Sequence, residues 1–202
     1  RKMEYNFTSD KQVTLSGVNL TVKDADKDEV KNLFAGDEVP TSKNGRLKLD
    51  FKRDAEGTIV VENRTEDGYL YEVYTMNITP ELPNGVTPIT RNMTWVDTAR
   101  APLNDDDQFK VVEGEDLVNV EKNNDGELVI TGIEEKTGKA VIEVFDARGT
   151  WARYELTIGE PEVKERVYEV STNASFQATM VDNKKHFMVI EGASNFEQPE
   201  EK

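Results

Sequence analysis

The 202-residue chain contains no cysteine, and this absence removes a whole class of chemistry. Without thiols the chain has no disulfide bond, no thiolate nucleophile and no cysteine-based zinc site. It also has a single histidine, His186, which follows Lys184 and Lys185 next to a predicted turn, and it has no G-x-S-x-G motif. A Ser-His-Asp triad would have to use this histidine, so the sequence argues against a hydrolase and predicts a protein without catalytic residues.

Long hydrophobic runs are also absent. No stretch of 18 apolar residues occurs, so we expect no membrane insertion. Acidic residues exceed basic ones by 15, with 14 Lys/Arg against 17 Asp/Glu in residues 1–100 and 11 against 23 in residues 101–202. An acidic surface repels phosphate backbones and anionic lipids, which excludes nucleic acid as a partner. Two interpretations of the acidic second half stay open: a solubilising surface, or an interface for a cation or a basic partner.

The sequence does have strand periodicity separated by turn residues. In the segment TGKAVIEVFDARGTWARYELTI, residues 137–158, Ala140, Ile142 and Val144 alternate with Val141, Glu143 and Phe145. The turn Asp146-Ala147-Arg148-Gly149 follows, and a second run alternates Trp151, Arg153, Glu155 and Thr157 with Ala152, Tyr154, Leu156 and Ile158. This period of two on both sides of a turn predicts a β-hairpin, with Ile142 and its partners in the core.

The preceding segment DLVNVEKNNDGELVITGI, residues 116–133, repeats this strand–turn–strand pattern. Together the two segments resemble the second half of group 2 bacterial immunoglobulin-like domains, through Gly126, Leu128, Ile130, Gly132, Gly138, Ala140, Ile142, Val144, Asp146, Gly149, Leu156 and Ile158. Trp95 is the candidate for the upstream tryptophan of that family. The resemblance implies a β-sandwich that serves cell-surface or viral proteins as a spacer, adhesive or lattice element, without catalytic residues.

The rest of the chain indicates an all-β fold of immunoglobulin-like β-sandwich modules with at most one short helix, expected within residues 28–36. Strands are predicted at residues 4–8 and 12–22, and residues 47–78 are predicted to form a three-stranded meander. The breaker-rich segment TPELPNGVTP divides the chain into an N-terminal β-rich domain (1–84), the immunoglobulin-like sandwich (85–160) and C-terminal strands with an acidic tail (161–202). We expect the last part to pack on the N-terminal domain or on a neighbouring subunit.

Two acidic segments are candidate metal sites because clustered carboxylate and amide oxygens suit calcium. One contains Asp24, Asp26 and Asp28, and the other contains Asn104, Asp105 and Asp107. The first departs from the EF-hand pattern, with Glu29 at the sixth position and Ala35 at the twelfth. Solvated acidic loops are the alternative interpretation; no other cofactor is indicated.

Tyr69, Tyr71 and Trp151 are candidate binding residues, because flat aromatic side chains hold sugar rings. Asp and Glu are abundant, so carboxylate pairs for glycoside chemistry are not singled out by spacing; Glu72, beside Tyr71 on the same predicted strand, is the single candidate. The alternative is that these tyrosines only decorate the face of a sheet. Glycosylation motifs Asn-x-Ser/Thr give a further set of candidates: Asn6, Asn19, Asn63, Asn92 and Asn173.

Two functions therefore stay open. The first is a non-catalytic structural or adhesive protein, extracellular and on a cell or virion surface, that acts through contacts with itself or with other surface proteins. The second is a carbohydrate-binding module that uses exposed Tyr and Trp. For the first, segment Arg166–Ile190 is the expected assembly contact, since an unpaired edge strand can pair with a neighbour.

Overall fold

The computed structural model describes residues 1–163, 167 and 187–189, and these residues form two compact units. The first unit comprises Arg1–Thr87 together with Val144–Ala152. The second comprises Pro88–Glu143 and the described residues from Arg153 onward. None of the helices in this described part is long and apolar enough to cross a membrane.

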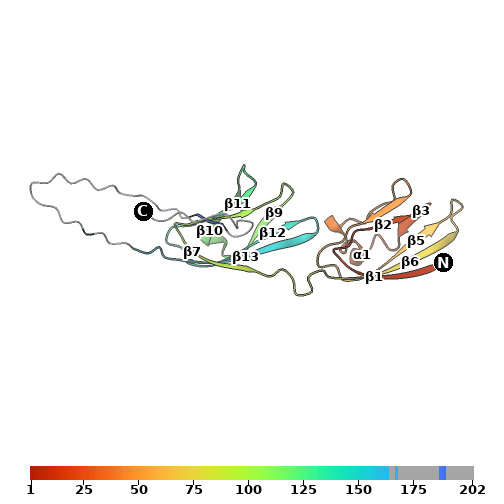
Figure 1. Cartoon of the computed structure of the whole chain (residues 1–202), viewed down its shortest axis with the longest axis horizontal. Helices are drawn as coiled ribbons and strands as arrows, with labels where there is room; N and C mark the ends of the chain where they lie inside the picture. The colour runs from red at the N-terminus through yellow and green to blue at the C-terminus, as the bar shows by residue number, and fades with distance from the viewer. Residues whose placement is uncertain (164–166, 168–186, 190–202) are drawn as a thin grey trace, which may run out of the picture. The chain divides into compact units, whose positions relative to one another are not determined.

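The first unit consists of two sheets and short helical turns (Figure 1). Its elements are β1 (Lys2–Thr8), β2 (Val13–Ser16), β3 (Asn19–Val22), α1 (Asp28–Lys31), η1 (Ala35–Asp37), β4 (Arg46–Leu49), β5 (Gly57–Arg64) and β6 (Leu70–Thr79). One sheet has the order β1-β6-β5-β3, and the other is the pair β2-β4. Strand β1 runs parallel to β6, and the other pairs are antiparallel.

The second unit has two four-stranded sheets. Its elements are β7 (Ile89–Thr94), β8 (Thr98–Pro102), β9 (Gln108–Glu113), η2 (Glu115–Leu117), β10 (Val118–Lys122), β11 (Glu127–Gly132), β12 (Gly138–Asp146), β13 (Gly149–Gly159) and β14 (Phe187–Val189). The sheets have the orders β7-β13-β12-β9 and β10-β11-β8-β14, and β7 runs parallel to β13.

The two units share one strand order. In the first unit β1 runs parallel to β6, and β6 pairs with β5, which pairs with β3. In the second unit β7 runs parallel to β13, and β13 pairs with β12, which pairs with β9. In each unit the second strand belongs to the opposite sheet. Two sheets arranged in this way, with C, F and G strands on one side and B and E strands on the other, form the immunoglobulin-like sandwich. The expected all-β fold is confirmed, with one short α-helix among the described residues.

Alternating apolar residues form the core of each unit, as the sequence predicted. In the first unit, Leu47 and Leu49 of β4 are fully buried, and Phe51 stacks on Phe34 with ring centroids 5.3 Å apart. The apolar positions of the family resemblance are all buried, Val144 among the residues of the first unit and the others in the second: Leu128, Ile130, Ala140, Ile142, Leu156 and Ile158. Val141, which alternation placed on the other face, is also fully buried, so that part of the prediction is wrong.

Two further predictions are corrected by the sheet order. The expected meander over residues 47–78 does not form, because β4 pairs with β2 while β5 and β6 pair with each other. The segment between β4 and β5 is thus a crossing between sheets: Phe51 and Ala55 are both buried in the core. Likewise, the predicted strand at residues 12–22 divides at Gly17 into β2 and β3, which lie in different sheets.

The C-terminal strand β14 pairs with the second unit. Phe187–Val189 runs parallel to β8, with Met188 opposite Ala99. The sequence predicted packing on the N-terminal domain or on a neighbouring subunit; residues 187–189 pair with the second unit of their own chain. His186 lies outside the described residues.

The turn of the β12–β13 hairpin is held within the first unit by two arginines. Arg53 donates to both carboxylate oxygens of Asp146, at 2.7 and 2.8 Å, and to the carbonyl oxygen of Gly149 at 2.6 Å. Arg148 donates to Glu81 Oε1 at 2.6 Å. The hydrogen bonds from Arg53 lower the pKa of the Asp146 carboxyl below its ordinary value. The carboxylate therefore stabilises the turn in its ionised form.

Candidate functional site

The turn that joins β5 and β6 is closed by its own hydrogen bonds. The Thr65 N–H donates to the Tyr69 carbonyl at 2.9 Å, and the Tyr69 N–H donates to Thr65 Oγ1 at 3.1 Å. Gly68 has a φ of 83°, which glycine adopts without strain, and its carbonyl accepts from Arg64 at 3.1 Å. These bonds fix the backbone from which the following side chains project.

Three consecutive large side chains after this turn are exposed to solvent. The exposed fractions are 76% for Tyr69, 40% for Leu70 and 58% for Tyr71, and nearby Val18 is 59% exposed. We call Val18, Tyr69, Leu70 and Tyr71 the aromatic tip. Exposed large side chains on a hydrogen-bonded turn are typical of a contact surface.

A β-bulge places Tyr71 in this cluster. Asn63 pairs with Glu72 and Arg64 pairs with Leu70, so Tyr71 is the extra residue of β6. A bulge leaves one residue without a cross-strand partner and redirects its side chain. Bulges are common next to binding sites for this reason, and the irregular register was not visible in the alternation of the sequence.

A shallow hollow of about 400 Å³ lies beside the tip. It is lined by Val18, Asn63, Arg64, Thr65, Glu66, Asp67 and Tyr71. The hollow thus combines one aromatic ring with charged and amide groups, a composition that suits a polar ligand with one flat apolar face.

Asn63 is the buried support of this hollow. Its side chain is 3% exposed, its Nδ2 donates to Glu72 Oε1 at 2.9 Å, and its Oδ1 accepts from the Asn19 N–H at 3.3 Å. A methyl group on Gly17 would come within 2.6 Å of the Asn63 amide, so a side chain at that position would displace this amide. The Asn63 amide, a predicted glycosylation acceptor, is thus buried in the folded unit.

Glu72 takes part in the same support. Its Oε1 accepts from Asn63, and its carboxylate adjoins Tyr74. Burial, followed by the nearby Glu72, raises the pKa of the Tyr74 hydroxyl above its ordinary value. Glu72 is thus a hydrogen-bonded structural carboxylate behind the tip. Asn63, Val18 and Leu70 were not singled out as binding residues by the sequence, although Gly17 next to Val18 was a signal of close packing.

Trp151 does not lie with the tyrosines of the tip. It is half-buried on β13, two residues after Gly149, whose carbonyl accepts from Arg53. The Arg53 carbonyl in turn accepts from Ser9, and Ser9 bonds the carbonyl of Thr79 at the far end of β6. The ten residues of β6 separate this end from the aromatic tip, a span of about 30 Å at roughly 3.3 Å per residue.

The predicted calcium ligands build turns. The Asp107 side chain is buried, and its Oδ2 accepts from the Asn104 N–H at 2.7 Å. Asp24 has a left-handed φ of 57°, and its Oδ2 lies 3.8 Å from Lys27 Nζ. In the described part of the chain, no group of three or more His, Asp or Glu side chains is arranged to hold a metal ion. Asp26, Asp28 and Asp105 therefore belong to no such group of three or more ligands among the described residues.

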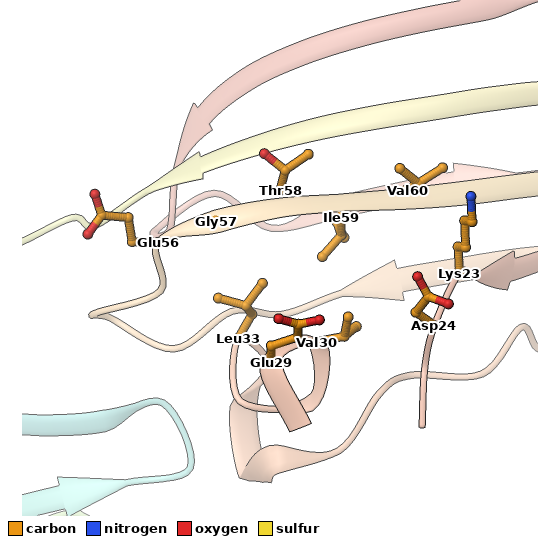
Figure 2. Close-up of a pocket in the computed structure, with 10 residues that line it drawn as sticks. All are labelled: Lys23, Asp24, Glu29, Val30, Leu33, Glu56, Gly57, Thr58, Ile59 and Val60. Carbon is orange, nitrogen blue, oxygen red and sulfur yellow. The ribbon is translucent and has the colours of Figure 1, made fainter. Parts of the chain in front are cut away.

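A second hollow, of about 390 Å³, lies between α1 and the start of β5 (Figure 2). Val30, Leu33 and Ile59 approach one another in it, and Glu56 and Lys23 lie at opposite ends of the row. Its acidic groups Asp24, Glu29 and Glu56 are spread along this row (Figure 2). The hollow offers an apolar floor with a mixed-charge rim and no convergent set of carboxylates.

The other glycosylation motifs differ in position. Asn6 and Asn19 are exposed residues of β1 and β3, and Asn92 is exposed on β7. The Asn6 side-chain oxygen accepts from Asn77 at 2.8 Å. Asn173 lies outside the described residues.

Comparison with known proteins finds no family for this chain and only remote similarity to solved structures. No protein-family model matches it, and no curated protein matches it. Similar solved structures include tandem immunoglobulin domains A164-A165 of titin, with 12% identity, a TM-score of 0.23 and coverage of 79% of this chain and 94% of that chain. A SusE-like surface-located polysaccharide-binding protein of Bacteroides thetaiotaomicron has 8% identity and a TM-score of 0.29, over 78% of this chain and 33% of that chain.

A third similar structure is a Bacteroides ovatus protein, SGBP-B, solved with a mixed-linkage heptasaccharide. It has 12% identity and a TM-score of 0.24, over 76% of this chain and 42% of that chain. This chain therefore spans less than half of both Bacteroides structures. Such scores carry no functional argument, and the immunoglobulin-like assignment rests on the strand order of the two units. Membership of the bacterial group 2 subfamily is not shown.

Proposed function

We propose that this chain is a non-catalytic structural or adhesive module, extracellular on a cell envelope or virion, that acts through protein–protein contacts. The aromatic tip is the observation that carries the proposal. Tyr69, Leu70 and Tyr71 are exposed side by side on a turn whose backbone is fixed by hydrogen bonds. Tyrosine is enriched at protein interfaces because it provides a large contact area at a small cost in conformational entropy.

A second candidate function is favoured by the hollow beside Tyr71. An aromatic ring next to Arg64, Glu66 and Asp67 offers both a stacking face and hydrogen-bonding groups for a sugar. The net charge of −15 repels anionic glycans, so the ligand of such a site is a neutral glycan. Trp151 belongs to a different place in the fold and is not part of this candidate site.

The two functions are separated by one pair of variants. We expect Tyr69→Ala/Tyr71→Ala to weaken self-association of the chain about tenfold, the loss that follows when aromatic contacts are removed from an interface. The matched control is Leu82→Ala, because Leu82 is exposed to the same 40% as Leu70 but lies outside the tip. Sedimentation velocity over a range of concentrations measures the effect.

The same proteins are then run in affinity gels that contain a neutral mixed-linkage glucan or heparin. Retardation by the glucan that is lost in the double variant establishes the glycan function and replaces the first proposal. A chain that neither associates nor binds glucan contradicts both. An association that both variants weaken equally contradicts the role of the tip.

A further inference from the structure

The outer edge of β8 is occupied by a strand from the distant C-terminal segment. On its other side β8 pairs antiparallel with β11, from Thr98 opposite Thr131 to Pro102 opposite Glu127. On the outer edge, Phe187, Met188 and Val189 pair in parallel with residues 98, 99 and 100. The edge of β8 therefore accepts an added strand through its backbone groups, as in β-augmentation.

This added strand is not needed to complete the sandwich. The first unit has the same strand order, and its second strand, β2, pairs with β4 alone among the described residues. That unit still has a core in which Leu47, Leu49 and Phe51 are fully buried. Strand β14 is thus an addition to a complete module.

The connection of β14 to its module is long and its pairing is short. Residues 160 to 186, which are 27 positions, separate the end of β13 at Gly159 from Phe187. The pairing covers three residues and is parallel, and parallel pairs are slightly less stable per residue than antiparallel ones. Backbone bonds do not depend on which copy supplies the strand, so residues 187–189 of another copy make the same bonds to β8.

We infer that the outer edge of β8 is a strand-acceptor site and that a second copy of this chain supplies residues 187–189 to it in an assembly. The inference rests on the proposed function in assembly and names both the partner and the site. Each copy then donates one strand and accepts one, without any new contact at the aromatic tip. Because both copies are acidic, salt screens their repulsion and favours the exchange.

The absence of cysteine allows a direct test by disulfide trapping. One copy carries Arg100→Cys and a second, tagged copy carries Val189→Cys, at positions that face each other in the register. Arg100 is chosen because it is half-buried, whereas Thr98 and Ala99 are buried. The matched control replaces Val189→Cys by Val163→Cys, since Val163 is 91% exposed and outside every strand. A double variant with both Arg100→Cys and Val189→Cys in one chain reports pairing within a copy.

We expect a mixed disulfide between the Arg100→Cys and Val189→Cys copies that is several times more abundant than in the Val163→Cys control. Its yield rises with protein concentration and with salt. A disulfide that forms only within the double variant makes β14 a fixed part of its own module and overturns the inference. No disulfide in either arrangement also overturns it, because β14 then does not pair with β8.

Proline variants give a second measurement. The N–H groups of neighbouring strand residues point alternately to the two sides of the strand, and proline has no N–H. Met188→Pro/Val189→Pro therefore removes at least one hydrogen-bond donor to β8. Val163→Pro, outside every strand, removes none. We expect the double proline variant to lower the self-association of the full chain and Val163→Pro to leave it unchanged. Association that survives the proline variant but is lost in Tyr69→Ala/Tyr71→Ala overturns the exchange and keeps the proposed function. Loss in the proline variant with no effect of the tip variant keeps the exchange and rejects the tip.

Discussion

The corresponding sheets of the two units have the same strand order and different outer surfaces. In the first unit, Asn77 donates to Glu4 at 2.9 Å and to Asn6 at 2.8 Å, so β1 and β6 are joined by amide and carboxylate groups. In the second unit, Arg153 contacts Glu143 and Glu155, both at 3.1 Å. Lys110 and Lys139 extend these ion pairs. The fold therefore depends on strand order and core, while polar residues outside differ freely.

The edges of the units differ as well. Strand β8 carries β14 on its outer edge, whereas β2 carries no such strand within the described residues. The buried alanines of β8, Ala99 and Ala101, contrast with Val13 and Leu15 of β2, which stay half-buried. The comparison indicates that the fold forms both with an added strand on the outer edge of its second strand, as in β8, and without one, as in β2.

The largest effect is expected from cavities in the two cores. Ile142→Ala in the second unit and Ile59→Ala in the first each remove a buried side chain, at 0% and 2% exposure. Each change should lower the free energy of unfolding by about 2–4 kcal/mol, through lost burial and the cavity that remains. Hydrogen exchange of the amides of each unit measures where the loss occurs. An unchanged denaturant midpoint for Ile142→Ala means that the residue is not in the core.

Two glycines pack closely, Gly132 against the backbone of Trp95 and Gly17 against the side chain of Asn63. A Cβ at Gly132 would lie 2.5 Å from the Trp95 Cα, so the backbone of the second unit must shift. Gly132→Ala should destabilise the second unit by about 1–3 kcal/mol, the cost of overpacking. Gly17→Ala meets the side chain of Asn63, which rotates at the cost of its bond to Glu72, about 1 kcal/mol. Chemical denaturation measures the free energy of unfolding of each variant. A larger loss for Gly17→Ala than for Gly132→Ala contradicts this prediction.

Arg53, which holds the hairpin turn, should contribute more to the free energy of unfolding than a surface ion pair does. Arg53→Ala leaves the partly buried Asp146 without its partner and should cost the first unit about 1–2 kcal/mol at neutral pH. The control is Lys52→Ala, whose partner Asp37 is 60% exposed, with an expected cost below about 0.5 kcal/mol.

The pH dependence of this difference follows from the lowered pKa of Asp146. The unfolded carboxyl binds protons more readily than the folded one, so the stabilisation is complete above the ordinary carboxyl pKa of about 3.9 and is lost as the pH falls through the folded value. The stability gap between the wild type and Arg53→Ala should therefore narrow on acidification. Urea denaturation between neutral and acidic pH measures it, and a gap that widens at low pH contradicts the assignment.

The smallest effect is expected on the charged sheet of the second unit. Arg153→Ala removes two ion pairs whose side chains are partly exposed, so the loss should be about 0.5–1 kcal/mol. Added salt should reduce that loss because it screens the pairs. Asn77→Ala in the first unit removes neutral hydrogen bonds as well as one to Glu4, and its effect should depend less on salt. Thermal unfolding at low and high salt distinguishes the two surfaces.

The candidate site was only partly predictable from the sequence. Tyr69 and Tyr71 were identified because flat aromatic side chains can hold sugar rings, and both are exposed. The bulge at Tyr71 and the burial of Asn63 depend on how β5 pairs with β6, and residue types along one strand do not contain that register. The separation of Trp151 from the tip has the same cause, since sequence order gives no distance between strands.

Periodicity and turn residues alone indicate the all-β class and the hairpin at residues 137–158. Alternation of apolar and polar residues with a period of two decides which side chains are buried, and glycine with aspartate decides where the chain turns. Three other features depend on how the strands pair in space: β4 lies in the sheet of β2, Val141 is buried, and Phe187–Val189 pairs with β8. Every strand offers the same backbone donors and acceptors on both edges, so periodicity fixes a strand's inner face but not its neighbour.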